Sequence, residues 1–311
     1  MKLIEVRDLY KAYGSLKAVD GVSFNVNAGE VFGLLGPNGA GKSTLISMVT
    51  TLARQDKGEI YIEGNDINKK SKEAKRSIGL VPQEIALYPT LTARENLMFW
   101  GRMYGLGGKS LGERVNEALE IAGLTDRQKD RIDSYSGGMK RRINIAAALL
   151  HKPKVLVMDE PTVGIDPQSR NHILETVLKL NKEGMTIIYT SHYMEEVEFL
   201  CTRIAIMDHG KIIASGSKEE LRKLAGEFDI INIDVSNASD DLEGMLKSIE
   251  GVSKVSMEQN TLKVYAKDSG TLLAKVISAL DSKKSKIHNI GIEETNLETV
   301  FLHLTGRALR D

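Results

Sequence analysis

The chain has 311 residues, enough for one large domain and a small one. Its 42 basic and 42 acidic residues give a formal net charge of zero, which argues against a nucleic-acid-binding protein. The single cysteine, Cys201, excludes a disulfide framework within the chain and favours a reducing compartment. No segment offers the roughly 20 apolar residues that span a bilayer, and the first residues lack the apolar core of a signal peptide, so we expect a soluble or peripheral protein.

Strands of two kinds come first in chain order. Residues 2–7, 22–26 and 59–62 alternate apolar and polar side chains, which predicts half-buried antiparallel strands and an N-terminal antiparallel β subdomain. Short apolar runs predict buried parallel strands at 31–35, 155–158, 186–190 and 204–207. Helical patterns lie between these runs at about 43–53, 137–150, 167–182 and 193–200. This alternation predicts an α/β fold with a mostly parallel sheet and helices on its faces.

Two further regions depart from that alternation. Helix-favouring stretches predict an inserted helical subdomain at about 88–150. A charged helix at 216–228 would end the main domain, which we place at residues 1–225. Residues 226–311 follow the order strand, helix, strand, strand, helix, strand, which predicts a small α+β domain of the ferredoxin-like type, closed by an amphipathic helix at 297–304.

A phosphate-binding loop follows the apolar run at 31–35. Its residues match the pattern G-x-x-x-x-G-K-[ST] and are Gly36, Pro37, Asn38, Gly39, Ala40, Gly41, Lys42, Ser43 and Thr44. Glycines let backbone N–H groups approach phosphate oxygens, and the helix that starts near Lys42 points its positive end at the anion. Lys42 would contact the β- and γ-phosphates, and Ser43 would offer its hydroxyl to Mg²⁺. By itself the loop indicates only a nucleoside triphosphate, since kinases and GTPases share it.

Two acids follow the buried run at 155–158. An unpaired carboxylate is costly in a core, so Asp159 is expected to hold the Mg²⁺ water shell beside the phosphate loop. Glu160, directly after it, is a candidate to polarise the water that attacks the γ-phosphate. The alternative is a pair of solvated acids at a strand end.

A second anion site is predicted at Ser136, Gly137 and Gly138, which enter a helix. Ser136 is a good N-cap, and the two glycines expose backbone N–H groups at the helix N-terminus. Because one nucleotide needs only one such site per chain, the second site suggests a nucleotide held by another subunit.

Together these motifs resemble those of ATP-binding-cassette (ABC) ATPases over about residues 1–225. Ser136 to Met139 resembles the LSGGQ signature of that family, although Tyr135 and Met139 depart from its commonest form. The resemblance implies a P-loop NTPase core that binds ATP with Mg²⁺. It also implies a dimer, with a homodimer expected, in which each ATP lies between the phosphate loop of one subunit and the Ser136 turn of the other.

Four more residues take their roles from this resemblance. Tyr13 lies where an aromatic ring stacks on adenine, although a strand-surface tyrosine is the alternative. Gln83 resembles the glutamine that binds Mg²⁺ and links the site to the membrane partner, and Asp166 lies in the loop that crosses the dimer interface. His192 resembles the histidine that contacts the γ-phosphate, which places it with Lys42 and Glu160 in catalysis.

The tail at 296–311 resembles the end of single-cassette exporter ATPases of the drug-resistance type, whose membrane permease is encoded separately. The apolar stretch 84–92 suits a partner groove for a cytoplasmic helix of that permease, with internal packing of the helical subdomain as the alternative. The resemblance therefore implies an ATPase that drives an exporter from the cytoplasmic face of the membrane.

Two rival functions stay open at this point. A soluble cassette could act on ribosomes or DNA, but a single cassette and a neutral charge argue against it. A structural cassette without hydrolysis is disfavoured by the Asp159–Glu160 pair. We therefore expect no nucleic-acid partner.

Overall fold

A computed structural model describes residues 1–224, 229–236, 242–258, 261–267, 269–283, 285–293 and 296–305. The chain divides into two compact units, Met1–Ser217 and a second unit that begins at Lys218. The division precedes the predicted boundary at 225, because the charged helix α8 (Lys218–Leu224) packs on α11 (Leu297–Thr305) inside the second unit. Our expectation that this helix ends the main domain was therefore wrong.

The first unit begins with an antiparallel sheet in the strand order β2-β1-β4-β5. Its strands are β1 (Lys2–Tyr13), β2 (Leu16–Asn27), β4 (Lys57–Ile62) and β5 (Asn65–Asp66). The three predicted N-terminal strands lie in this sheet, although β1 and β2 extend further than their alternating patterns suggested. Side chains of alternate residues in β1, such as Ile4 and Val6, are buried beneath it.

A six-stranded sheet forms the centre of the first unit, in the order β10-β9-β3-β8-β7-β6. The strands are β3 (Val31–Leu35), β6 (Ile78–Val81), β7 (Val155–Asp159), β8 (Thr186–Ser191), β9 (Arg203–Asp208) and β10 (Lys211–Gly216). Five of them are parallel, and β10 pairs antiparallel with β9. Every residue of β3, β7 and β8 is buried, as parallel strands covered on both faces require. The α/β fold is therefore confirmed.

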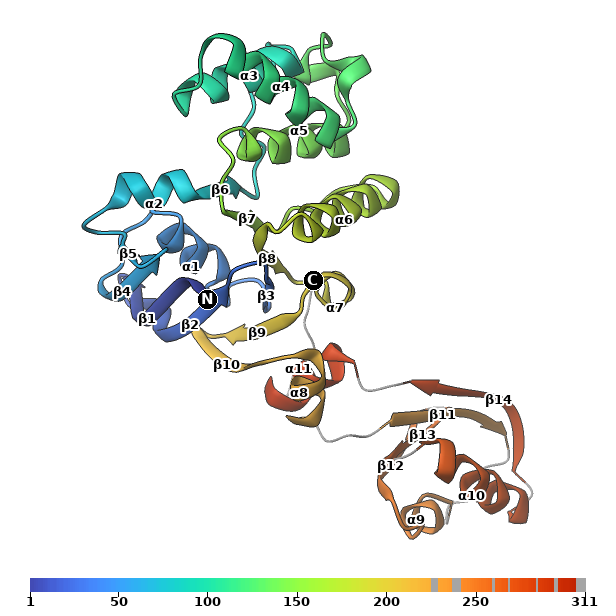
Figure 1. The fold of residues 1–311 in the computed structure, drawn as a ribbon. Coiled ribbons are helices and arrows are strands. Elements are labelled where there is room, and N and C mark those ends of the chain that lie inside the picture. Colours follow the sequence, from blue (N-terminus) through green and yellow to red (C-terminus); the bar gives the residue numbers. More distant parts are fainter. Residues whose placement is uncertain are drawn as a thin grey trace. The chain divides into compact units, whose positions relative to one another are not determined.

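Helices of the first unit connect these strands (Figure 1). They are α1 (Lys42–Val49), α2 (Ser71–Ser77), α3 (Ala93–Met103), α4 (Gly108–Ala122), α5 (Gly137–Leu149), α6 (Pro167–Lys182) and α7 (Met194–Leu200). Two short 3-10 turns, Thr125–Arg127 and Ile132–Ser134, precede α5. Within the described residues no helix is long and apolar enough to cross a bilayer.

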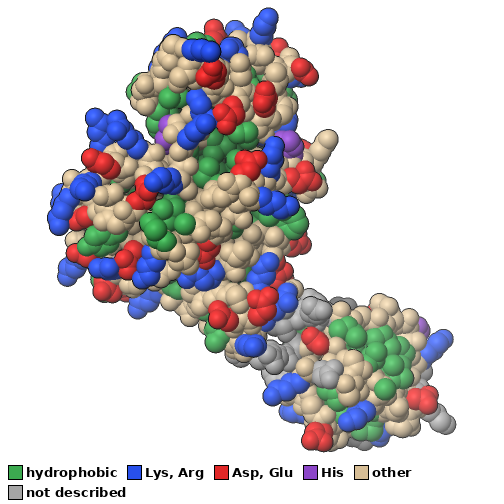
Figure 2. Space-filling view, viewed as in Figure 1, with side chains coloured by type: hydrophobic (Ala, Val, Ile, Leu, Met, Phe, Trp, Pro, Cys, Tyr) green, Lys and Arg blue, Asp and Glu red, His purple; other side chains and the backbone are tan. Residues whose placement is uncertain are grey.

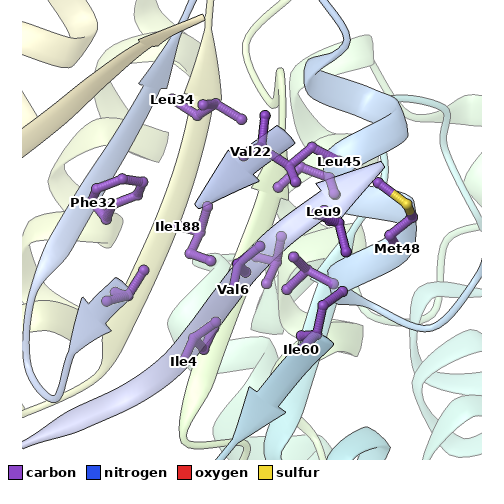
Figure 3. Packing of buried hydrophobic residues seen from close by; sticks show 14 of the residues in the cluster. Ile4, Val6, Leu9, Val22, Phe32, Leu34, Leu45, Met48, Ile60 and Ile188 are labelled. Carbon is purple, nitrogen blue, oxygen red and sulfur yellow. The ribbon is translucent and has the colours of Figure 1, made fainter. Parts of the chain in front are cut away.

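The main hydrophobic core joins the two sheets through α1. Figure 3 shows Leu9 and Ile60 of the antiparallel sheet beside Leu45 and Met48 of α1, with Ile188 of the central sheet close by. All five side chains are almost fully buried. This packing fixes the start of α1, and with it the phosphate loop, against both sheets.

The inserted helices form a subdomain with its own core. Buried residues from Leu87 to Leu150 make one hydrophobic cluster that draws on α3, α4 and α5. A capping box between Thr92 and Glu95 starts α3, and Gly123 ends α4 in the left-handed conformation. These helices lie together at one end of the first unit (Figure 1).

The second unit contains an antiparallel sheet in the order β12-β13-β11-β14. Its elements after α8 are β11 (Asp229–Ser236), α9 (Leu242–Lys247), β12 (Val252–Glu258), β13 (Thr261–Ala266), α10 (Ser269–Ser282), β14 (Lys286–Glu293) and α11. The helices α9 and α10 pack on the sheet around a core that includes Ile231, Leu262 and Val276. Element order and strand order are those of a ferredoxin-like domain, as predicted.

Candidate active site

The phosphate loop connects β3 to α1 at the carboxyl end of the central sheet. Gly41 caps the helix with φ of 103°, and a Cβ there would lie 2.1 Å from the backbone oxygen of Ala18. Only glycine fits this position. Asn38 and Gly39 are exposed at the tip of the loop, whereas Ala40 is buried. The N-terminus of α1 has no side-chain cap, so its backbone N–H groups are available to an anion.

Lys42 folds back over this loop. Its Nζ donates hydrogen bonds to the carbonyl oxygens of Gly36 at 2.8 Å and Pro37 at 3.2 Å. It also lies 2.9 Å from Glu160 Oε1, and only 4% of the lysine side chain and 6% of the glutamate side chain are exposed. A buried ammonium group held by two carbonyls and a carboxylate is positioned to face the phosphate loop.

Asp159 and Glu160 stand at the carboxyl end of β7, next to the end of β8. Thr190 joins them, since its Oγ1 donates to Asp159 Oδ1 at 2.7 Å and accepts from the Glu160 N–H at 2.9 Å. Glu160 has φ of 44°, a conformation that L-residues other than Asn and Asp seldom adopt. Both acids are buried, so the structure excludes a solvated pair of acids at a strand end.

His192 follows β8 and reaches the same carboxylate. Its Nδ1 lies 3.2 Å from Glu160 Oε2, while Lys42 occupies the other oxygen of that group. The structure therefore brings together the three residues to which the sequence assigned catalysis. A carboxylate between a lysine and a histidine can orient a water molecule.

The Ser136 turn begins α5 as predicted. Ser136 accepts a hydrogen bond from the Met139 N–H at 3.2 Å, and a Cβ on Gly138 would meet Ser169 Oγ at 2.0 Å. Ser169 also donates its N–H to Asp166 Oδ1 at 2.9 Å, which lowers the pKa of that carboxyl. The turn thus packs on the N-terminus of α6. Across the described residues, no hydrogen bond or ion pair joins the Ser136 turn to the phosphate loop.

Tyr13 ends β1 with 53% of its surface exposed. Lys11 lies over its ring with Nζ 5.4 Å from the centroid, and Asp56 holds this strand end through Lys11 Nζ at 2.9 Å and the Ala12 N–H at 2.7 Å. An exposed ring on a fixed strand end can stack on a base. The alternative of a surface tyrosine is compatible with the same geometry.

Gln83 follows β6 and has an exposed side chain. Its backbone carbonyl contacts Arg141, a residue that the sequence did not single out. Arg141 of α5 is 4% exposed and donates to the carbonyl oxygens of Pro82, at 2.6 Å, and Gln83. Burial lowers the pKa of its guanidinium. Arg141 therefore ties the Ser136 helix to the segment that carries Gln83. Its place one turn into that helix was the only sequence signal for this role.

Comparisons with known sequences agree on one protein family. Residues 19–163 match the family described as ABC transporter. The linearmycin resistance ATP-binding protein LnrL of Bacillus subtilis (strain 168) is 53% identical over 99% of this chain and 100% of its own length. The chain belongs to the ABC transporter ATP-binding family.

Other relatives agree with this placement. The Nod factor export ATP-binding protein I of Ralstonia nicotianae is 38% identical, over 99% of this chain and 95% of the relative. The daunorubicin resistance ATP-binding protein DrrA3 of Streptomyces coeruleorubidus is 37% identical, over 97% and 96%. As an ABC subunit, the chain is an ATPase that drives transport, and a soluble cassette acting on ribosomes or DNA is not favoured.

Solved structures of ABC cassettes share the fold. The ATP-binding subunit of an ABC transporter superposes with a TM-score of 0.65 at 30% identity, covering 71% of this chain and 92% of that one. A dimeric cassette in a post-hydrolysis state, bound to ADP and Pi, gives 0.63 at 28% identity, covering 69% and 98%. The fold expected of this ABC subunit is thus confirmed.

Three residues to which the sequence assigned Mg²⁺ offer oxygen donors at the ends of elements of the first unit. The exposed Ser43 offers a hydroxyl in the first turn of α1, Asp159 a carboxylate at the end of β7, and Gln83 an amide at the end of β6. Mg²⁺ is commonly held by one or two protein groups together with phosphates and water. The single carboxylate of this set fits that pattern.

Proposed function

We propose that this chain works as a homodimer that closes on two ATP molecules and opens after their hydrolysis. Each ATP would lie between the phosphate loop of one subunit and the Ser136 turn of the other. The observation that carries this proposal is the presence in one chain of two helix N-termini suited to anions, one at Lys42 and one at Ser136. A similar cassette forms a dimer with bound ADP and Pi.

Each residue of the buried cluster takes one role in the proposed hydrolysis. Glu160 accepts a hydrogen bond from the attacking water and orients it, with Lys42 and His192 fixing the carboxylate from either side. Lys42 also stabilises negative charge on the β- and γ-phosphates, and His192 donates to the γ-phosphate. Ser43, Gln83 and Asp159 would hold Mg²⁺, which would supply further charge neutralisation when bound.

Adenine recognition falls to Tyr13 in this proposal. Its exposed ring would stack on the base. Removal of the ring would weaken ATP binding by about 1–3 kcal/mol. Asp166 and the Ser136 turn, which contact each other through Ser169, would meet the partner subunit across the interface.

We further propose that the dimer drives a multi-span permease in the direction of export. Relatives named for export and for drug resistance support the direction, and a similar cassette is part of an ABC transporter complex. The permease would contact the cassette at the cytoplasmic face of the membrane.

A groove below the helical subdomain fits this permease contact. Its volume is about 420 Å³, and Figure 2 shows hydrophobic side chains gathered in a hollow there. It is lined mainly by apolar side chains, among them Leu52, Ile78, Leu80, Pro82, Ala86, Trp100 and Tyr104. Within the predicted stretch 84–92, Ala86 lines the groove while Leu87 packs in the subdomain core, which is compatible with both uses proposed for the stretch.

Replacement of an exposed groove residue tests the permease site. Leu52 is 70% exposed, so Leu52→Glu should leave the fold intact while it places a charge in the apolar groove. The permease should co-purify at least about tenfold less with this variant. Ile213→Glu, on the exposed strand β10, is the matched control and should retain the permease. Undiminished capture by Leu52→Glu would rule out this groove.

A further inference from the structure

Glu196 of α7 is a buried carboxylate that the roles above do not use. None of its surface is exposed. Its Oε2 accepts three hydrogen bonds from hydroxyl groups, from Thr162 at 2.8 Å, Tyr189 at 2.8 Å and Ser191 at 3.1 Å. A buried charge is costly without such partners. The three hydrogen bonds to one carboxylate therefore form a polar network rather than a chance contact.

A fourth partner completes the network from another helix. Arg170 Nε of α6 approaches the other oxygen, Oε1, to 2.6 Å, as an ion pair rather than a well-aligned hydrogen bond. Burial and the charge of Glu196 raise the pKa of Tyr189 well above its usual range, so the phenol stays protonated and donates. Glu196 therefore acts as an acceptor at the meeting point of α6, α7, β8 and the loop after β7.

The hydroxyl donors come from the two segments that carry catalytic residues. Thr162 lies two residues after Glu160, and Ser191 directly precedes His192. Ser191 Oγ also accepts from the Tyr193 N–H at 2.9 Å, so the backbone on both sides of His192 is fixed. A single carboxylate thus connects the loop behind Glu160 to the turn that presents His192.

Such a connection is needed because the catalytic geometry is not self-supporting. Glu160 has φ of 44°, a conformation that persists only where its surroundings hold it. The 3.2 Å separation between His192 Nδ1 and Glu160 Oε2 depends on the relative position of these two segments.

We propose that Glu196 is a positioning residue for ATP hydrolysis, holding the loop after Glu160 and the turn at His192 in the arrangement that lets both act on the γ-phosphate. This inference rests on the roles of Glu160 and His192 in the proposed function. Glu196 acts through these residues and touches no reacting atom.

Isosteric removal of one hydroxyl tests the connection. Thr162→Val keeps the shape of a side chain that is 3% exposed but removes its hydrogen bond to Glu196, and Tyr189→Phe does the same from β8. We expect each variant to lower kcat for ATP about tenfold, with less than about a twofold change in KM, because misplaced catalytic groups slow the chemical step. Thr162→Ser, which restores the hydroxyl, should recover most of the kcat.

Matched controls separate this role from general stability. Thr176→Val removes a hydroxyl that bonds only within α6, and Tyr61→Phe removes one that bonds Glu59 on β4. Both should keep the wild-type kcat. Equal losses of kcat in these controls, or a low kcat in Thr162→Ser, would show that packing and not the Glu196 network is responsible.

A double-variant cycle with His192→Ala gives the decisive comparison. If Glu196 acts by placing His192 against Glu160, Thr162→Val should cost less than about twofold once His192 is gone. A full tenfold loss in that background would overturn the placement of His192 against Glu160 by this network. Wild-type kcat in Thr162→Val beside a low kcat in His192→Ala would overturn this inference alone, whereas wild-type kcat in His192→Ala would overturn the role of His192 as well.

Discussion

Lys42 Nζ lies 2.9 Å from Glu160 Oε1, and both side chains are almost fully buried. The pair joins the start of α1 to the end of β7, so two segments more than a hundred residues apart in the sequence meet in one ion pair. Because the pair is buried, we expect its loss to lower the free energy of unfolding, apart from any effect on turnover.

Lys42→Ala should destabilise the chain because it removes the cation that neutralises a buried Glu160. Breaking one side of a buried pair costs about 3–5 kcal/mol, although His192 still faces the carboxylate and should hold the loss near the lower value. The double variant Lys42→Ala/Glu160→Gln should recover most of this loss, since no buried charge is left unpaired. Urea unfolding measures both, and additive losses would contradict the coupling. Lys42→Ala should also weaken ATP binding at least about tenfold.

Ser136→Ala should reduce both helix stability and ATP-driven dimerisation. The side chain caps α5 through the Met139 N–H, and loss of an N-cap costs about 1 kcal/mol. Asn296→Ala is the matched control, because Asn296 accepts from the Thr299 N–H at the start of α11. Light scattering with ATP should show a lost dimer only for Ser136→Ala. A dimer that persists in that variant would remove the Ser136 turn from the proposed interface.

We predict that the chain loses stability at acid pH because of His151. Its Nε2 lies 2.9 Å from the Ile78 carbonyl oxygen, and its ring stacks on Tyr104 with centroids 3.8 Å apart. Burial, with a smaller effect from the charge of Arg114, lowers the pKa of His151. The folded state therefore favours the neutral ring. The stability that His151 contributes to the fold is fully present above its ordinary pKa of about 6.5. This contribution is lost as the pH falls through the lower pKa of the folded state.

The measurement for His151 is the melting temperature between pH 7.5 and pH 5.5. Wild-type protein should lose more on acidification than His151→Gln, which keeps a donor for the Ile78 carbonyl but cannot gain this charge. His209→Gln, at a site whose side chain is 81% exposed, should behave like the wild type. Equal pH dependence in wild type and His151→Gln would refute the prediction.

The sequence was most informative where burial leaves a simple pattern. The largely apolar runs of β3, β7 and β8 marked the parallel sheet, and the residues after them gave Lys42, Glu160 and His192. Because carboxyl ends of parallel strands share one edge of a sheet, the order of these motifs was enough to place them together.

Other elements left weaker signals. The strand β6 has only four residues, and β10 alternates exposed and half-buried side chains beside a glycine, so neither was predicted. The helix α8 is charged like a surface helix, and only its packing on α11 assigns it to the second unit.

Two buried charges were also missed, for a common physical reason. Arg141 and Glu196 lie in helices, where a charged residue normally indicates a solvated face. Their partners are the backbone oxygens of Pro82 and Gln83 in one case and hydroxyl groups from β8 and the loop after β7 in the other. Contacts that depend on how separate strands, helices and loops pack become visible only in three dimensions.

The most direct test of the account is the behaviour of Glu160→Gln with ATP and Mg²⁺, followed by phosphate release and light scattering together. We predict that this variant binds ATP and forms a stable dimer, while its phosphate release falls at least about a hundredfold. Glu175→Gln, an exposed residue of α6, should match the wild type in both measurements. Phosphate release at the wild-type rate by Glu160→Gln would contradict the catalytic assignment, and a monomer in saturating ATP would contradict the dimer that encloses it.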